Sequence, residues 1–245
     1  MIAQALYGPQ PPNRPPSDWF LLMDDDMTPE PHYLHRLLAH KLDIVVGICT
    51  VRTDPAKPTI RLWNPELEVF AEILDWDFTS EKLLEIDAAG TAFALVSRKV
   101  LEAMSEAYLN CVFERAEDER KVGPSERLTA YWDKRAERRR KRFEICREKQ
   151  DWRNMDCWWF QFFDNISDKQ FGEVGEDITW CYKAKKLGFR IFADQQVLPG
   201  HIGTYAYSLR DYIACLKDAK ENGAMPLDAP AVLPQIAPLS QPAVA

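Results

Sequence analysis

The sequence has no long apolar segment, no export signal and no excess of positive charge. No stretch approaches 18 consecutive apolar residues, so no transmembrane helix is expected. The N-terminal segment lacks a basic start and a continuous apolar run, so no signal peptide is expected. A net charge of −7 disfavours wrapping of nucleic acid by phosphate neutralisation. We therefore expect a cytoplasmic protein, and peripheral contact with a membrane stays an open alternative.

Motifs for metal-thiolate, redox and phosphate-loop chemistry are absent as well. The six cysteines are scattered and none forms C-x-x-C, which excludes a zinc ribbon and a thioredoxin-type site. Free thiols are expected rather than disulfides, because no export signal is visible. Neither G-x-G-x-x-G nor G-x-x-x-x-G-K-[ST] occurs, which argues against a nucleotidyltransferase.

The composition and the order of apolar segments predict an α/β fold. Hydrophobic residues make up 46% of the 245 residues, which is enough for one sizeable core. A short apolar strand over 19–23 ends in three aspartates. A helix follows, with Thr28 as its expected cap, and a β-branched strand runs over 44–50. This strand–helix–strand order predicts a βαβ unit with the two strands paired in parallel.

Later segments continue the alternation of strands and helices. Strands are expected at 59–63, 68–74, 84–87, 91–96 and 190–193. Helices are expected at 98–108, 176–187 and 209–222, and Gly188 is the expected C-terminal cap of the second.

We divide the chain by composition into three parts. Residues 1–18 are proline-rich and are expected to form an irregular lead-in to a domain over 19–223. Residues 224–245 are rich in proline and alanine and are expected to form a flexible tail.

A charged helical insertion is expected over 113–149. Within 133–149, nine Lys and Arg residues oppose four acids, a local net charge of +5. Two interpretations stay open: a solvated charged helix, or a cationic surface that meets an anionic acceptor, a partner or a phospholipid surface.

Three clusters of side chains are suited to chemistry. Asp24-Asp25-Asp26 follows the strand over 19–23; clustered carboxylates are tolerated where Mg²⁺ or Mn²⁺ neutralises them, and the alternative is a metal-free acidic turn. Glu176 and Asp177 begin a helix, where they either favour the helix dipole or supply a general base. His201 lies between Gly200 and Gly203, in a turn that allows close approach of a ligand, although a surface histidine is the plainer interpretation.

The order of these clusters resembles a known enzyme family. The segments are W-F-L-L-M-D-D-D-M-T-P, D-A-A-G-T-A-F-A-L-V-S-R-K-V, W-F, G-E-D-I-T-W-C-Y-K-A-K-K-L-G-F-R-I-F-A-D and H-I-G. Together they resemble the GT-A family of nucleotide-sugar glycosyltransferases, particularly the family 2-like enzymes. The resemblance spans 18–212 apart from the basic insertion.

The resemblance implies a fold and a metal site. The fold is a Rossmann-like GT-A mixed sheet flanked by helices. Asp24 and Asp26 match the D-x-D motif that holds Mn²⁺ or Mg²⁺ on the donor diphosphate, with Asp26 as the direct ligand. His201 matches the histidine that completes the metal site in some members.

The resemblance also assigns the reaction to particular residues. Asp177 matches the catalytic base, and Glu176 precedes it in the family's E-D motif. The donor and acceptor site would include Asp25, Gly90-Thr91-Ala92, Trp158 and Trp159.

The implied activity is a hexosyltransferase-type transfer from a nucleotide-sugar donor to the hydroxyl of a glycan, lipid-linked or protein acceptor, with inversion by default. The usual N-terminal unit that binds the nucleotide base has no counterpart upstream of the D-x-D pair. A non-catalytic binding or assembly protein of the same fold is therefore the alternative, and exposed strand edges favour a homo-oligomer.

Overall fold

The fold is given by a computed structural model of the chain. It describes residues 2–9, 16–51, 57–66, 69–73, 80–156, 163, 166–168, 172–203 and 206–207. The expected helix over 209–222 and the expected tail over 224–245 lie outside these residues.

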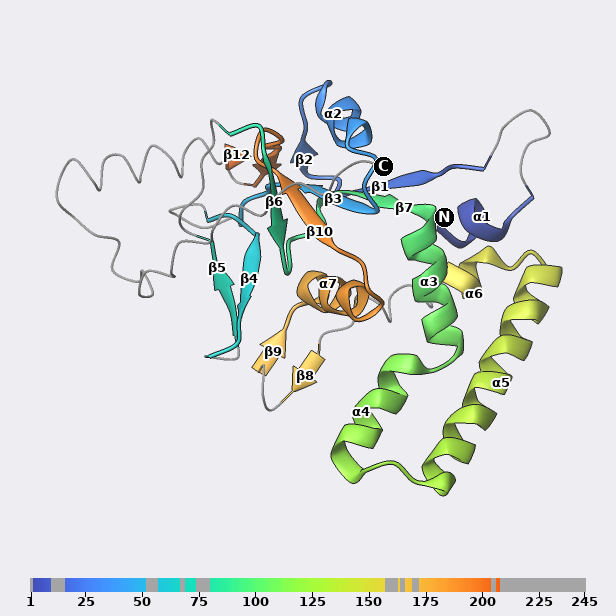
Figure 1. Ribbon diagram of the computed structural model, residues 1–245. Coiled ribbons are helices and arrows are strands. Elements are labelled where there is room, and N and C mark those ends of the chain that lie inside the picture. The colour runs from blue at the N-terminus through green and yellow to red at the C-terminus, as the bar shows by residue number, and fades with distance from the viewer. Residues whose placement is uncertain are drawn as a thin grey trace, which may run out of the picture.

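A five-stranded mixed sheet forms the centre of the molecule (Figure 1). Its order is β1 (Trp19–Met23), β7 (Phe93–Ser97), β3 (Ile44–Gly47), β10 (Ile191–Asp194) and β6 (Leu83–Ile86). Only β3 and β10 pair in parallel, and the other three neighbouring pairs are antiparallel. The expected α/β fold with a mixed sheet flanked by helices is confirmed.

The predicted parallel pairing of the first two long strands is wrong. β7 lies between β1 and β3 and pairs with both in antiparallel register, so β1 and β3 run in the same direction without touching. The reason is that β7 is apolar on both faces and all five of its residues are buried, as a strand central to a sheet requires.

Alternate residues of the central strands supply two cores, one on each face of the sheet. Val45, Phe93 and Leu95 pack with Leu37 of α2 (Tyr33–Ala39) on one face. Ile44, Val46, Ala94 and Val96 pack on the other face, together with buried residues of α3 (Arg98–Leu109) and α7 (Glu176–Lys186). Successive side chains of β3 and β7 point to opposite faces of the sheet, and both faces are buried, so neither β3 nor β7 alternates between apolar and polar residues.

The other elements lie around this central sheet. A second sheet is formed by the short strands β2 (Met27–Thr28), β11 (Gly200–Ile202) and β12 (Ala206–Tyr207). Two further pairs of strands are β4 (Arg61–Asn64) with β5 (Val69–Glu72), and β8 (Ile166–Asp168) with β9 (Gly172–Val174). The other helices are α1 (Ile2–Tyr7), α4 (Val112–Val122), α5 (Glu126–Glu148) and α6 (Trp152–Asp156). The expected insertion thus consists mainly of α4 and α5, which project from the end of α3 (Figure 1).

Two local predictions are wrong and one is confirmed. Thr28 does not cap α2: it belongs to β2, and α2 begins at Tyr33 because Pro29 and Pro31 lie in the intervening turn. The lead-in is not wholly irregular, since it contains α1. Gly188 has a φ of +88°, as expected for the glycine that follows a helix.

Across the part of the chain that the structure describes, no helix has both the length and the apolar character needed to cross a membrane.

Candidate active site

The candidate site begins where β1 ends. The backbone N–H of Asp24 donates to the carbonyl of Ala92 at 3.0 Å, which extends the pairing of β1 with β7 by one residue. The chain then turns through the three aspartates into β2, where Met27 pairs with His201 of β11. This second sheet brings together two segments that lie about 175 positions apart in the sequence.

Asp26 and His201 face one another across this second sheet. The Ile202 N–H donates to the carbonyl of Asp26 at 2.8 Å, and Asp26 Oδ1 lies 3.4 Å from His201 Nε2. Both side chains are largely shielded from solvent, with 26% of Asp26 and 15% of His201 exposed. The structure therefore places the predicted carboxylate and imidazole ligands next to each other.

The other ring nitrogen of His201 fixes how the imidazole is oriented. Nδ1 lies 2.8 Å from the carbonyl of Thr50, and a carbonyl oxygen only accepts, so Nδ1 bears the hydrogen. Nε2 is then the atom directed at Asp26. A backbone carbonyl is one of the groups that commonly accept from the remote nitrogen of a metal-binding histidine and so orient its ring.

Asp26 and His201 fit a divalent cation as a pair of ligands rather than as a complete cage. Among the described residues, no three His, Cys, Asp or Glu side chains are grouped closely enough to hold a metal ion, so Asp24 does not join the other two in a three-ligand set. Mg²⁺ commonly takes one or two protein ligands and completes its shell with water and substrate phosphate. Thr50 Oγ1, also buried here, has no hydrogen-bond partner in the described part of the chain.

Thr91 and Asp177 form the second part of the site. Asp177 is in the first turn of α7, and its Oδ1 accepts a hydrogen bond from Thr91 Oγ1, which precedes β7. Burial raises the pKa of Asp177, and the charges of Glu176 and Asp24 raise it further, whereas hydrogen bonds from Thr91 oppose the shift. Thr91 precedes Ala92, whose carbonyl accepts from the Asp24 N–H, so the start of α7 lies next to the end of β1.

Two buried thiols lie behind these carboxylates. Burial raises the pKa of Cys49 and of Cys181, the latter to about 12, and nearby carboxylates add to the effect at both. Cys181 Sγ also contacts the Ala89 backbone, at 3.4 Å from its nitrogen. Such protonated thiols are not nucleophiles, so they serve as packing beneath the site. Within the described residues Cys49, Cys111, Cys146 and Cys181 are free, as expected.

The remaining predicted residues occupy the edge of the site or lie outside the description. Asp24 and Asp25 are exposed in the turn, and Glu176 is exposed at the start of α7. Gly90 is buried, and a Cβ there would come within 3.1 Å of the Thr59 side chain. Trp158 and Trp159 lie outside the described residues.

Sequence reasoning missed two features of this region. The Thr50 carbonyl leaves no signal in the sequence, because any residue supplies one. The buried Asp194 at the end of β10 receives a hydrogen bond from Arg36 Nε at 2.7 Å and lies 2.7 Å from His40 Nε2. The only signal for this cluster was an aspartate directly after an apolar strand, a pattern that also describes Asp24.

Comparisons with known proteins add little to this geometry. No known protein family matches the sequence, and no curated protein matches it. A solved structure described as A197 from STIV is similar with a TM-score of 0.33 and 12% identity, over 76% of this chain. The chain spans 58% of that chain's length. The described residues define a mixed α/β protein with a carboxylate–imidazole pair and a partly buried carboxylate, Asp177, near one end of the sheet.

Proposed function

We propose that the protein is a metal-dependent glycosyltransferase that moves a sugar from a nucleotide-sugar donor to an acceptor hydroxyl. One observation supports this most directly. Asp26 and His201 face each other at 3.4 Å, with the imidazole oriented by the Thr50 carbonyl, near the end of the strand that precedes the D-x-D pair. The GT-A resemblance assigns the metal to Asp24, Asp26 and His201, a set that includes both of these residues.

Asp26 and His201 would hold the cation, and Asp24 would face the donor from the exposed side of the turn. When bound, Mn²⁺ or Mg²⁺ supplies positive charge that stabilises the leaving nucleoside diphosphate.

Asp177 is the proposed general base. It is held by Thr91, and its raised pKa gives the carboxylate a greater affinity for a proton than an exposed aspartate has. In the transfer, the acceptor oxygen forms a bond to the anomeric carbon and the bond from that carbon to the diphosphate oxygen breaks. The acceptor proton passes to Asp177, and one displacement of this kind inverts the anomeric centre.

Release of nucleoside diphosphate from UDP-, GDP-, CDP- and dTDP-sugars in the presence of Mn²⁺ tests this proposal. We expect one donor to raise the melting temperature and to be turned over. Asp177→Asn should keep the donor-induced shift and lower turnover about 100-fold or more, because a general base contributes at least that much. Glu30→Gln, an exposed acid outside the site, is the control and should retain turnover. Wild-type turnover in Asp177→Asn would contradict the assignment.

A second candidate function is a non-catalytic binding protein of the same fold. It is favoured by the finding that, within the described residues, no three metal-ligating side chains come together. A donor-induced rise in melting temperature without release of nucleoside diphosphate, at high protein concentration, would support this second candidate.

A further inference from the structure

The outer face of α5 presents a continuous cationic stripe. Inner-face residues Trp132, Phe143 and Cys146 are buried, which fixes the orientation of the helix. Opposite them lie six exposed cations, which we call the cationic stripe: Arg127, Lys134, Arg138, Lys141, Arg142 and, at the C-cap, Lys149. By helical geometry they fall within an arc of roughly 100° along a helix about 34 Å long.

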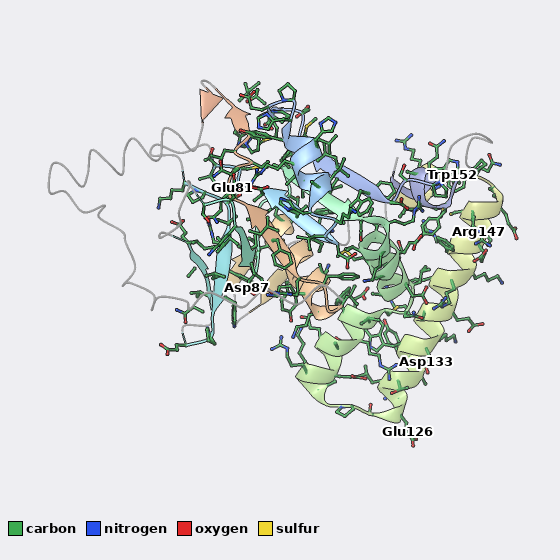
Figure 2. The ribbon with its side chains drawn as sticks, turned by 45° about the horizontal axis from the view of Figure 1, so that its top comes forward. Glu81, Asp87, Glu126, Asp133, Arg147 and Trp152 are labelled. Carbon is green, nitrogen blue, oxygen red and sulfur yellow. The ribbon has the colours of Figure 1, made fainter. Side chains whose placement is uncertain are left out.

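Most of the charge of this stripe is not paired with neighbouring acids; Asp151 interacts electrostatically with Arg142 and Lys149. Several other cations of the hairpin are paired, such as Arg139 with Glu114 and Arg140 with Glu106. None of the six stripe residues forms an ion pair or a side-chain hydrogen bond with another described residue. No acid of α5 falls within the arc, and Glu137, Glu144 and Glu148 lie along one flank of it. Figure 2 shows the side chains of this helix, from Glu126 past Asp133 to Arg147, projecting at the outer edge of the molecule.

We propose that the cationic stripe docks the protein on the surface of an anionic lipid bilayer. A straight row of cations matches a flat anionic surface along its whole length, and each Lys or Arg near such a surface adds about 1 kcal/mol of attraction. Two exposed apolar side chains lie in the same row and reach the headgroup level: Tyr131, 53% exposed, and Ile145, 41% exposed. The inference does not depend on the proposed function.

The flanking acids favour a flat surface over a nucleic acid groove. A duplex groove encloses a helix on several sides and would bring Glu137 and Glu144 against phosphates. A bilayer meets only the outward arc. Because the six stripe residues carry a charge of +6, the rest of the chain has a net charge of −13.

Sedimentation of the full chain with vesicles tests this proposal. We expect binding to phosphatidylcholine vesicles that contain about 30% phosphatidylserine, no binding to pure phosphatidylcholine, and loss of binding when salt rises from about 50 to about 500 mM. Lys134→Gln, Arg138→Gln and Lys141→Gln together should weaken binding about 100-fold, from about fivefold for each charge removed.

A variant with the same net charge is the control. Lys41→Gln, Lys82→Gln and Lys186→Gln remove three exposed cations elsewhere and should bind the anionic vesicles like the wild type. Equal weakening in the two triple variants would overturn the stripe as the docking surface. Absence of binding to the anionic vesicles at low salt, or tighter binding to a nucleic acid duplex than to the vesicles in the same buffer, would overturn the bilayer as the partner.

Discussion

At the scale of single residues, the partly buried Asp177 and the buried Asp194 show how the environment sets the chemistry of one residue type. Asp177 is partly buried, and desolvation together with the charges of Glu176 and Asp24 raises its pKa, against the opposing effect of the Thr91 hydrogen bonds. Burial acts in the same direction at Asp194, but hydrogen bonds from His40, Arg36 and the Gln196 N–H outweigh it and lower the pKa of that carboxyl. The local sequence does not distinguish Asp177 from Asp194, because the side chains that decide whether each pKa is raised or lowered come mainly from distant segments.

Asp177→Asn should change how stability depends on pH. The folded-state pKa of Asp177 is raised above its unfolded value near 4, so its stabilising contribution is present below that pH and is lost as the pH rises through the folded pKa. The Asn variant cannot lose this contribution. Its free energy of unfolding, measured by urea titration in the presence of a chelator, should rise relative to that of the wild type between about pH 4 and neutrality. If the difference in stability between the Asn variant and the wild type shrinks over this interval, the raised pKa of Asp177 is contradicted.

Asp194→Asn should behave in the opposite way. The pKa of Asp194 is lowered, so the stability that it contributes is present above the unfolded value near 4 and is lost as the pH falls through the folded pKa. We expect the variant to lose about 2–3 kcal/mol at pH 7, less than for a fully buried pair because Arg36 is 29% exposed. Urea titration measures this loss. Lys99→Gln, which breaks an exposed pair with Asp43, should cost much less. Equal losses in the two variants would contradict the proposed role of the Asp194 cluster.

At the scale of elements, the sequence predicted where strands and helices lie better than how they pair. The spacing of apolar residues, together with a glycine cap, predicted the bounds of β10, α3 and α7 to within one or two residues. The insertion of β7 between β1 and β3 was not predictable from local pattern, because a strand buried on both faces has the same apolar sequence wherever it pairs.

Arg139→Ala should detach the α4–α5 hairpin from α3. The Arg139 side chain is 12% exposed; it donates to the Tyr108 carbonyl at 2.7 Å and to Glu114 Oε1 at 2.5 Å. Loss of these charge-assisted hydrogen bonds should cost about 2 kcal/mol. Hydrogen exchange should show faster exchange across α4. Arg138→Ala, one position away on the exposed stripe, is the control and should change stability by less than about 0.5 kcal/mol. Similar exchange in both variants would contradict the anchoring role of Arg139.

At the scale of the whole molecule, the candidate site depends on segments that folding brings together. Asp26, Thr91, Asp177 and His201 come from four separate regions of the chain. Their order along the sequence resembles that of a GT-A enzyme, and the roles that this resemblance assigns to them stay predictions. The support of His201 by the Thr50 carbonyl could not be predicted, since it depends on backbone position alone.

Manganese binding tests the central claim most directly. The free aqueous Mn²⁺ signal in electron paramagnetic resonance can be titrated with protein in the presence of a nucleoside diphosphate. We predict that the wild-type protein removes this signal, and that Asp26→Asn and His201→Gln each weaken Mn²⁺ binding about tenfold or more while the fold is retained. Mn²⁺ binding as tight in both variants as in the wild type would contradict the account.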